Sequence, residues 1–448
     1  MGVNKRRTDA RKFALSRSGG NAVNSRRMLK EFELPLFEAP PRPTDFASEL
    51  RGFEGFGSKT LVTETVSSDG RVLVPTFVNE FWTAAQRDAD NLHEVSYRAC
   101  FKPQLPRFFI ERLTREGEVV YDPFMGRGTT LLEAAFLGRV PYGNDINPLS
   151  LMLIKPRLNP PLLSEVAARL EEIPFGRKTE IWEELLVFYH PETLAQISAL
   201  RSYFLEREAG RKLDALDEWI RMVAVNRLTG HAPGFFSVYS LPPNQAVSLK
   251  SQRRINEKRN QVPPRRDVAA LILKKSRSLL KDLDEATRGS FGRTFGNARL
   301  VNRPAAETDE IPAGSVSLVV TSPPFLDVVD YAGDNWLRCW FVGVDAKLVK
   351  LTVPKKLEEW QAQMTRVFVE LRRVLKVGGH VAFEVGEVRR GKVKLEETVI
   401  TCGLEAGLQP ELVLINEQEF TKTANCWGVD NNAKGTNSNR IVVFRKDG

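Results

Sequence analysis

Two short motifs in this sequence combine residue types that bind ligands or carry out chemistry. The first, Asp-Pro-Phe-Met-Gly-Arg-Gly-Thr-Thr at residues 122–130, follows the apolar residues 119–121. Glycine lets a backbone turn sharply and approach a ligand closely. A helix capped by the Thr129 hydroxyl would direct N–H groups at that ligand. Asp145 follows the next apolar run, and an acid there can accept hydrogen bonds from ribose hydroxyls. A tight strand–helix turn that binds no ligand would also explain this motif.

A second motif, Thr-Ser-Pro-Pro-Phe at residues 321–325, follows the apolar run 317–320. Two consecutive prolines cannot continue a central strand, so the chain must leave the sheet at this point. Ser322 and the neighbouring carbonyls can accept hydrogen bonds, and Phe325 offers an aromatic face. Such a rigid cluster suits a planar base that carries an exocyclic amino group. A proline-rich loop at the end of a strand is the alternative.

Taken together, the two motifs resemble those of the DNA amino-methyltransferase family. Enzymes of that family transfer a methyl group from S-adenosylmethionine to cytosine N4 or adenine N6. Residues 101–106 are similar to the family segment that closes over the methionine end of the cofactor, and residues 374–381 are similar to the turn and strand after the catalytic motif. The resemblance covers about residues 95–150 and 290–448.

The resemblance implies S-adenosylmethionine as the cofactor and gives particular residues a role. The residues that would line the cofactor site are Phe101, Pro103, Asp122, Phe124, Gly126, Gly128 and Thr129. Asp145 would bind the ribose hydroxyls. The target base would be held by the catalytic residues Ser322, Pro323, Pro324 and Phe325.

Within the family, serine before the two prolines favours cytosine N4 as the target, with adenine N6 as the alternative. The exocyclic amine is a poor nucleophile because its lone pair is delocalised into the ring. Acceptors at Ser322 and the Pro323 carbonyl would turn that lone pair toward the sulfonium methyl. The base must be flipped out of the duplex, and stacking on Phe325 would offset part of that cost. RNA base methylation and a catalytically silent nucleic-acid-binding protein are the remaining alternatives.

The positive charge of the chain is concentrated in two segments. The net charge is +9, of which residues 1–30 carry +8 and residues 250–281 carry +9, so the rest of the chain has a charge of −8. This distribution fits a polyanion, and the predicted partner is double-stranded DNA. The residues dense enough to follow a phosphate backbone are Arg253, Arg254, Lys258, Arg259, Arg265 and Arg266. A solvated helix face and a loose tail would also account for the charge.

Short apolar runs alternate with helical patterns, which is typical of an α/β fold with a parallel sheet. We expect a doubly wound Rossmann-like methyltransferase sheet of about seven strands with a mainly helical insertion. A hairpin is expected within residues 60–76, and a weak strand at residues 293–297. The expected organisation is a basic flexible N-terminal arm and linker at 1–45, a methyltransferase core at 46–155 and 286–448, and a helical basic insertion that recognises DNA at 156–285.

Composition argues against several other classes of protein. Hydrophobic residues make up 42% of the chain and charged residues 27%, which are ordinary values for a globular protein. No apolar run approaches the roughly 18 residues of a membrane span. The four cysteines and four histidines lack the spacing of a metal site, and scattered cysteines fit a reducing compartment. We therefore expect a cytoplasmic protein without a metal or a membrane partner.

Overall fold

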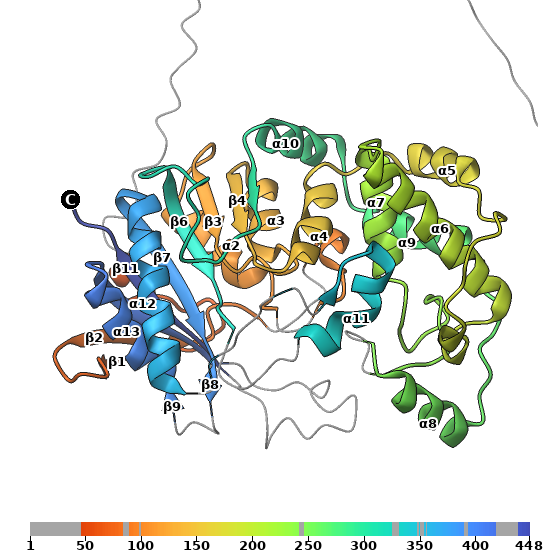
Figure 1. Ribbon diagram of the computed structural model, residues 1–448. Coiled ribbons are helices and arrows are strands. Elements are labelled where there is room, and N and C mark those ends of the chain that lie inside the picture. Colours follow the sequence, from red (N-terminus) through yellow and green to blue (C-terminus); the bar gives the residue numbers. More distant parts are fainter. Residues whose placement is uncertain are drawn as a thin grey trace, which may run out of the picture. The chain divides into compact units, whose positions relative to one another are not determined.

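The computed structural model describes residues 46–83, 89–97, 100–241, 246–324, 331–346, 349, 354, 356–388, 393–417 and 438–448 (Figure 1). The predicted N-terminal arm at 1–45 and the predicted base-stacking residue Phe325 lie outside these residues. The chain divides into two units, Met1–Pro41 and Arg42–Gly448, and every element described below belongs to the second.

A nine-stranded sheet forms the centre of the second unit, as far as the structure describes it. Its order is β1-β2-β10-β11-β7-β6-β3-β4-β5. The strands β5, β4, β3, β6 and β7 run parallel, and β11 is antiparallel to β7. The bounds are β1 Leu61–Val66, β2 Leu73–Asn79, β3 Val119–Asp122, β4 Val140–Asn144, β5 Arg299–Val301, β6 Val316–Thr321, β7 Leu375–Val385, β10 Gln409–Glu417 and β11 Ser438–Arg445. Two short strands, β8 (Glu387–Val388) and β9 (Val393–Lys394), pair separately.

Helices cover both faces of this sheet, which explains why every residue of β4 and β6 is buried. In β6, Val319 belongs to one hydrophobic cluster, whereas Leu318 and Val320 belong to another, because successive side chains of a strand point to opposite faces. The first cluster is covered by α12 (Leu357–Val374) and α13 (Leu395–Glu405). The second is covered by α1 (Phe46–Arg51) and α2 (Gln104–Leu113). The prediction of a doubly wound α/β sheet is therefore confirmed.

The segment between β4 and β5 is mainly helical, as predicted. Its elements are α4 (Pro148–Leu158), α5 (Leu163–Glu172), the 3₁₀ helix η3 (Glu183–Val187), α6 (Pro191–Ala209), α7 (Ala215–Val225), α8 (Leu249–Arg259), α9 (Val268–Leu279) and α10 (Glu285–Phe295). The boundary predicted after residue 155 falls inside α4.

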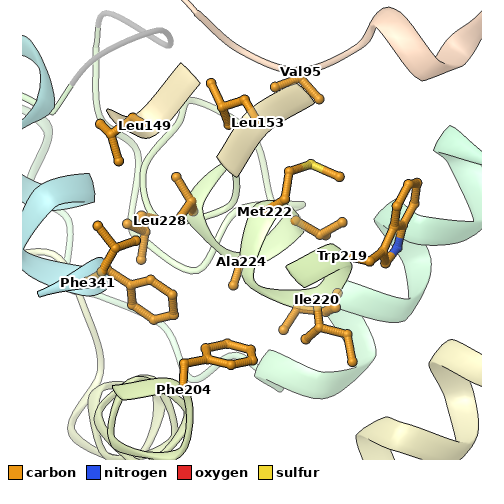
Figure 2. Packing of buried hydrophobic residues seen from close by; sticks show 14 of the residues in the cluster. Val95, Leu149, Leu153, Phe204, Trp219, Ile220, Met222, Ala224, Leu228 and Phe341 are labelled. Carbon is orange, nitrogen blue, oxygen red and sulfur yellow. The ribbon is translucent and has the colours of Figure 1, made fainter. Parts of the chain in front are cut away.

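One hydrophobic cluster joins these helices to the rest of the fold (Figure 2). Figure 2 shows Phe204 of α6 close to Phe341, with ring centroids 6.3 Å apart, whereas the Trp219 ring of α7 points away from these two rings. Phe341 lies on α11 (Tyr331–Val342), which follows the second sequence motif along the chain. Leu131 and Leu132 of α3 (Thr129–Phe136), a helix that packs on β3 and β4, belong to the same cluster. The helical segment and the sheet are thus held together by shared apolar burial.

The strand predicted at residues 293–297 is wrong, because α10 extends to Phe295. The Asp284 carboxylate caps this helix by accepting from the Thr287 N–H at 2.8 Å. The buried ring of Phe291 packs edge-on against Phe136 of α3, with ring centroids 5.0 Å apart. Capping and burial therefore favour the helix, and the strand that pairs with β4 begins only at Arg299.

Candidate active site

The two sequence motifs lie at the same edge of the sheet. β3 ends at Asp122, β4 ends just before Asp145, and β6 ends just before Ser322. Because β3 pairs in parallel with both β4 and β6, the carboxyl ends of the three strands meet. This edge is where open α/β sheets bind ligands.

Asp122 connects the glycine motif to the Ser-Pro-Pro motif. Its Oδ1 accepts a hydrogen bond from the Thr321 hydroxyl at 2.6 Å and another from the Phe124 N–H at 3.1 Å. The residue is 1% exposed, and burial raises the pKa of its carboxyl to about 7. This carboxylate was predicted to line the cofactor site, and the structure shows that it holds together the ends of two strands.

The turn after β3 requires its two glycines. Gly126 and Gly128 have φ angles of 48° and 80°, in the left-handed region that disfavours side chains. A Cβ on Gly128 would lie 2.4 Å from Cδ1 of Ile154 on α4, and one on Gly126 would lie 3.3 Å from the Tyr97 ring. The turn is therefore packed closely between α4 and the segment that contains Tyr97.

The prediction that Thr129 caps α3 is wrong. Gly128 occupies the N-cap position, and no side chain caps the helix there. Thr129 is the first helical residue, and its hydroxyl accepts from Nε of Arg127 at 3.2 Å. The left-handed conformation of Gly128 leaves Thr129 one position too late to act as the cap.

Asp145 fixes the glycine turn against the end of β4. Its Oδ2 accepts from the Gly126 N–H at 2.8 Å, and its Oδ1 accepts from the Asn147 N–H at 2.8 Å. The side chain is half-buried, and burial raises its pKa. A carboxylate offers about four lone-pair sites, so this one retains capacity for a hydroxyl donor while it orders the turn.

A segment before α2 is bound to this turn by arginines that sequence patterns did not single out. Arg127 of the turn donates to the carbonyls of His93 and Val95, each at 3.3 Å. Arg157 of α4 donates to the Leu92 carbonyl at 3.2 Å and also to the Arg127 carbonyl. Burial lowers the Arg157 pKa to about 9. His93 closes the 3₁₀ helix η2 (Asn91–His93).

The predicted cofactor residues Phe101 and Pro103 follow this segment. Pro103 is buried at the N-cap of α2, and Phe101 is half-buried against the apolar cluster beneath that helix. Between them and the turn, the Tyr97 hydroxyl accepts from Nδ2 of Asn147 at 3.2 Å. Residues 92–97 thus border the glycine turn, and the arginine contacts hold them in place.

The Ser-Pro-Pro motif is held by two side chains that sequence reasoning missed. The Ser322 hydroxyl hydrogen-bonds to the carboxylate of Glu384 on β7, which also accepts from Nδ2 of Asn439 at 3.1 Å. Glu384 is 7% exposed, and burial raises its pKa. Nε1 of Trp360 donates to the Pro324 carbonyl at 3.0 Å. The signal for Glu384 was available, because an acid interrupts the apolar run 381–385.

The structure divides the six predicted DNA-binding cations into two groups. Arg253, Arg254 and Lys258 are exposed on α8, and within the described part of the chain they form no ion pair. Each of the other three contacts another side chain or is partly buried. The Arg259 guanidinium lies 3.7 Å from the Tyr239 ring centroid, Arg265 pairs with Glu192 at 2.8 Å, and Arg266 is half-buried.

Comparisons with known proteins identify the segment that carries the glycine motif. Residues 66–155 match the family model for DNA methylases. A stretch of 97 residues is 36% identical to the type II methyltransferase M.MvaI of Kocuria varians, and 62 residues are 37% identical to M.MjaII of Methanocaldococcus jannaschii. Residues 66–155 belong to the DNA amino-methyltransferase family.

This methyltransferase match includes Asp122, the two glycines and Asp145, but it ends before Ser322. The matched stretches cover 21% and 14% of this chain, and 20% and 12% of the two relatives. A solved structure, TrmN from Thermus thermophilus, covers 80% of this chain at 12% identity with a TM-score of 0.31, and 51% of its own chain is covered. That score is too low to support an argument about function.

The described residues contain no group of three or more His, Cys, Asp or Glu side chains that could hold a metal ion. In the same part of the chain, no helix is both long enough and apolar enough to span a bilayer.

Proposed function

We propose that this protein transfers a methyl group from S-adenosylmethionine to an exocyclic amino group of a flipped DNA base, most favourably cytosine N4. The observation that carries the proposal is the bond between Thr321 and Asp122. It joins the start of the Ser-Pro-Pro motif directly to the glycine motif of the matched family segment. Two sites that must exchange a methyl group therefore share one rigid edge of the sheet.

The residues of the glycine turn fit the proposed cofactor. The left-handed φ angles of Gly126 and Gly128 let the backbone turn sharply at the edge of the sheet where ligands bind. Asp145 would bind ribose hydroxyls through the lone pairs that its two backbone partners leave unused. Phe101, Pro103 and Phe124 would contribute apolar contacts. When bound, the cofactor supplies an electrophilic methyl group on a sulfonium.

The Ser-Pro-Pro residues would hold and orient the target amine. Because the Ser322 hydroxyl donates a hydrogen bond to Glu384, its oxygen lone pairs can accept from an amine N–H. The Trp360 contact fixes the Pro324 carbonyl and stiffens the motif. Holding the amine in line with the methyl group can supply roughly 7–11 kcal/mol of the barrier. Phe325 is proposed as the stacking surface for the flipped base.

The partner in this proposal is double-stranded DNA. Its support is the matched DNA methylase family together with the exposed cations Arg253, Arg254 and Lys258 on α8. Serine in the Ser-Pro-Pro motif favours cytosine N4 over adenine N6. Adenine N6 is the second candidate, because the same acceptors would hold its amine equally well.

Radiolabelled S-adenosylmethionine tests this function. The purified protein is incubated with unmethylated genomic DNA or RNA, and the nucleosides are then separated. Label in N4-methyldeoxycytidine is the expected result, and label in N6-methyldeoxyadenosine would change the base but keep the enzyme. Label confined to RNA nucleosides, or none despite bound cofactor, would contradict DNA methylation. The Ser322→Ala variant, which should bind cofactor normally, is the matched control.

A further inference from the structure

Helix α8 is held on the surface by polar contacts. Of its eleven residues, Gln252 alone is buried, and Leu249 and Ile255 are half-exposed. Nε2 of Gln252 donates to the Tyr239 carbonyl at 3.0 Å, and Nδ2 of Asn256 donates to the Val187 carbonyl at 2.7 Å. Apolar burial, the usual reason for a helix to pack, therefore contributes little to its position.

The opposite face of α8 carries a concentrated charge pattern. Lys250, Arg253, Arg254, Glu257 and Lys258 are all exposed and lie three or four positions apart, which places them on one side of the helix. Within the residues that the structure describes, none of the four cations is paired with a carboxylate. One face of α8 is therefore bound to the protein, and the exposed face carries guanidinium groups with no carboxylate partner. Such a face is suited to bind a polyanion.

Both ends of α8 are fixed in position. Ser248 caps the N-terminus by accepting from the Ser251 N–H at 3.2 Å. At the C-terminal end, the Arg259 guanidinium lies over Tyr239, and the left-handed Asn260 stops the helix. The exposed side chains therefore project from a rigid helix, as contacts with specific atoms require.

The residues just before α8 are hydrogen-bonded to α11, the helix that follows the Ser-Pro-Pro motif. Nε1 of Trp336 on α11 donates to the Ala246 carbonyl at 3.3 Å, two residues before the cap of α8. The Trp336 ring also packs at 5.9 Å from Trp182, which precedes η3, and at 6.2 Å from Phe188, which follows it. Because α8 packs on η3, Trp336 links α11 to the residues just before α8 and to the segments on either side of η3.

We propose that α8 is the element that reads DNA sequence, with Arg253, Arg254 and Glu257 meeting base edges in the major groove. The groove is about 12 Å wide and admits a helix. Arginine binds guanine O6 and N7 through two hydrogen bonds, and glutamate accepts from cytosine N4. Lys250 and Lys258 at the margins of the face would contact phosphates. The recognised site therefore contains a G·C pair. This inference rests on the proposed function, since it assigns the recognition step of the same enzyme.

Selection from a duplex library tests the proposal with binding as the readout. The full-length protein is equilibrated with duplexes that contain a randomised centre, and bound DNA is sequenced. The same selection is run on Arg254→Ala, on Glu257→Gln, and on Arg293→Ala, an exposed cation of α10 that serves as the charge-matched control for the arginine. Affinities for selected and random duplexes are then measured across a salt series.

The expected result is a G·C-containing site for the wild type and for Arg293→Ala. Arg254→Ala should bind that site about 5- to 150-fold more weakly and should relax selection at one position. Its affinity for random duplexes should change little. An equal loss of affinity for all duplexes, with a salt slope of binding smaller by about one unit, would show that Arg254 contacts only a phosphate. That result would overturn the proposal. Unchanged selection in both α8 variants would overturn it as well.

The outcome separates this inference from the proposed function. A wild-type protein that selects a site through α8 but transfers no methyl label would contradict the methyltransferase and leave the reading helix in place. A protein that methylates DNA but loses no selectivity in the α8 variants would contradict the reading helix alone.

Discussion

The Thr321 hydroxyl donates a 2.6 Å hydrogen bond to the Asp122 carboxylate at the ends of two adjacent parallel strands. Asp122 opens the glycine motif, and Thr321 precedes the serine of the second motif. Both side chains are buried. Breaking a hydrogen bond between two buried side chains leaves polar atoms without a partner, so this contact fixes the distance between the two halves of the proposed site.

Replacing Thr321 with valine removes this contact without changing side-chain volume. Thr321→Val should lower the free energy of unfolding by about 1–3 kcal/mol, because the Asp122 carboxylate stays buried with one partner fewer. Cofactor affinity should fall as well, since Phe124 and the turn depend on the same carboxylate. Urea unfolding and calorimetric titration measure the two effects. Thr294→Val, which removes a buried bond to the Ser290 carbonyl away from the site, is the control, and an equal loss of cofactor affinity there would contradict a special role for Thr321.

The raised Asp122 pKa predicts a pH dependence of stability. The folded protein binds a proton at this carboxyl up to about pH 7, whereas the unfolded chain releases it near the ordinary value of 3.8. Stability from this group is therefore complete below about pH 4 and is lost as the pH rises to about 7. In Asp122→Asn the amide oxygen can still accept from Thr321, and this loss disappears. The difference in unfolding free energy, variant minus wild type, should increase by a few kcal/mol between pH 4 and 7. A constant difference across that window would show that the carboxyl does not titrate there.

Gly128 and Gly117 allow two kinds of strain to be separated. Both have left-handed φ angles, 80° and 78°, but a Cβ would meet Ile154 at 2.4 Å only at Gly128. Gly117→Ala should cost about 1 kcal/mol of stability from backbone strain alone. Gly128→Ala should cost more, by a further 1–3 kcal/mol or so, because α4 must shift, and it should weaken cofactor binding. Thermal unfolding and equilibrium dialysis measure both, and equal losses in the two variants would rule out close packing at the turn.

Local sequence was sufficient to predict the two motifs and the strands that carry them. Asp145 and Ser322 each follow an apolar run, and parallel strands bring such positions to one edge. The same local reasoning failed at residues 293–297, where Asp284 and Phe291 favour a helix that begins earlier in the chain. It also misplaced the cap of α3, because the backbone angle of Gly128 is not visible in the order of residue types.

The side chains that support the motifs could not be predicted, because their partners are distant in sequence. Glu384 reaches Ser322 only because β7 lies beside β6, and Trp360 reaches Pro324 from α12. The arginines that hold residues 92–95 donate to carbonyls, and such bonds leave no pattern in the sequence of the acceptor. What sequence did offer was the acid inside the apolar run of β7, which marks a buried charge that needs a partner.

Glu384 is expected to act as a positioning residue through Ser322. In Glu384→Gln the side chain keeps an acceptor oxygen but loses its charge, so the Ser322 hydroxyl is oriented less firmly. We expect kcat to fall about 10- to 100-fold, by the scale of a lost partner that orients a functional side chain, with cofactor Kd unchanged. The kcat of the wild type should also fall as the pH is lowered, because Glu384, whose pKa is raised by burial, becomes protonated. The variant should lack that decline. Glu370→Gln, a buried acid bound to Thr308 and Arg373, is the control and should retain the wild-type pH profile. A Glu384→Gln enzyme with normal kcat, or with the same acidic decline, would show that Ser322 is positioned by other contacts.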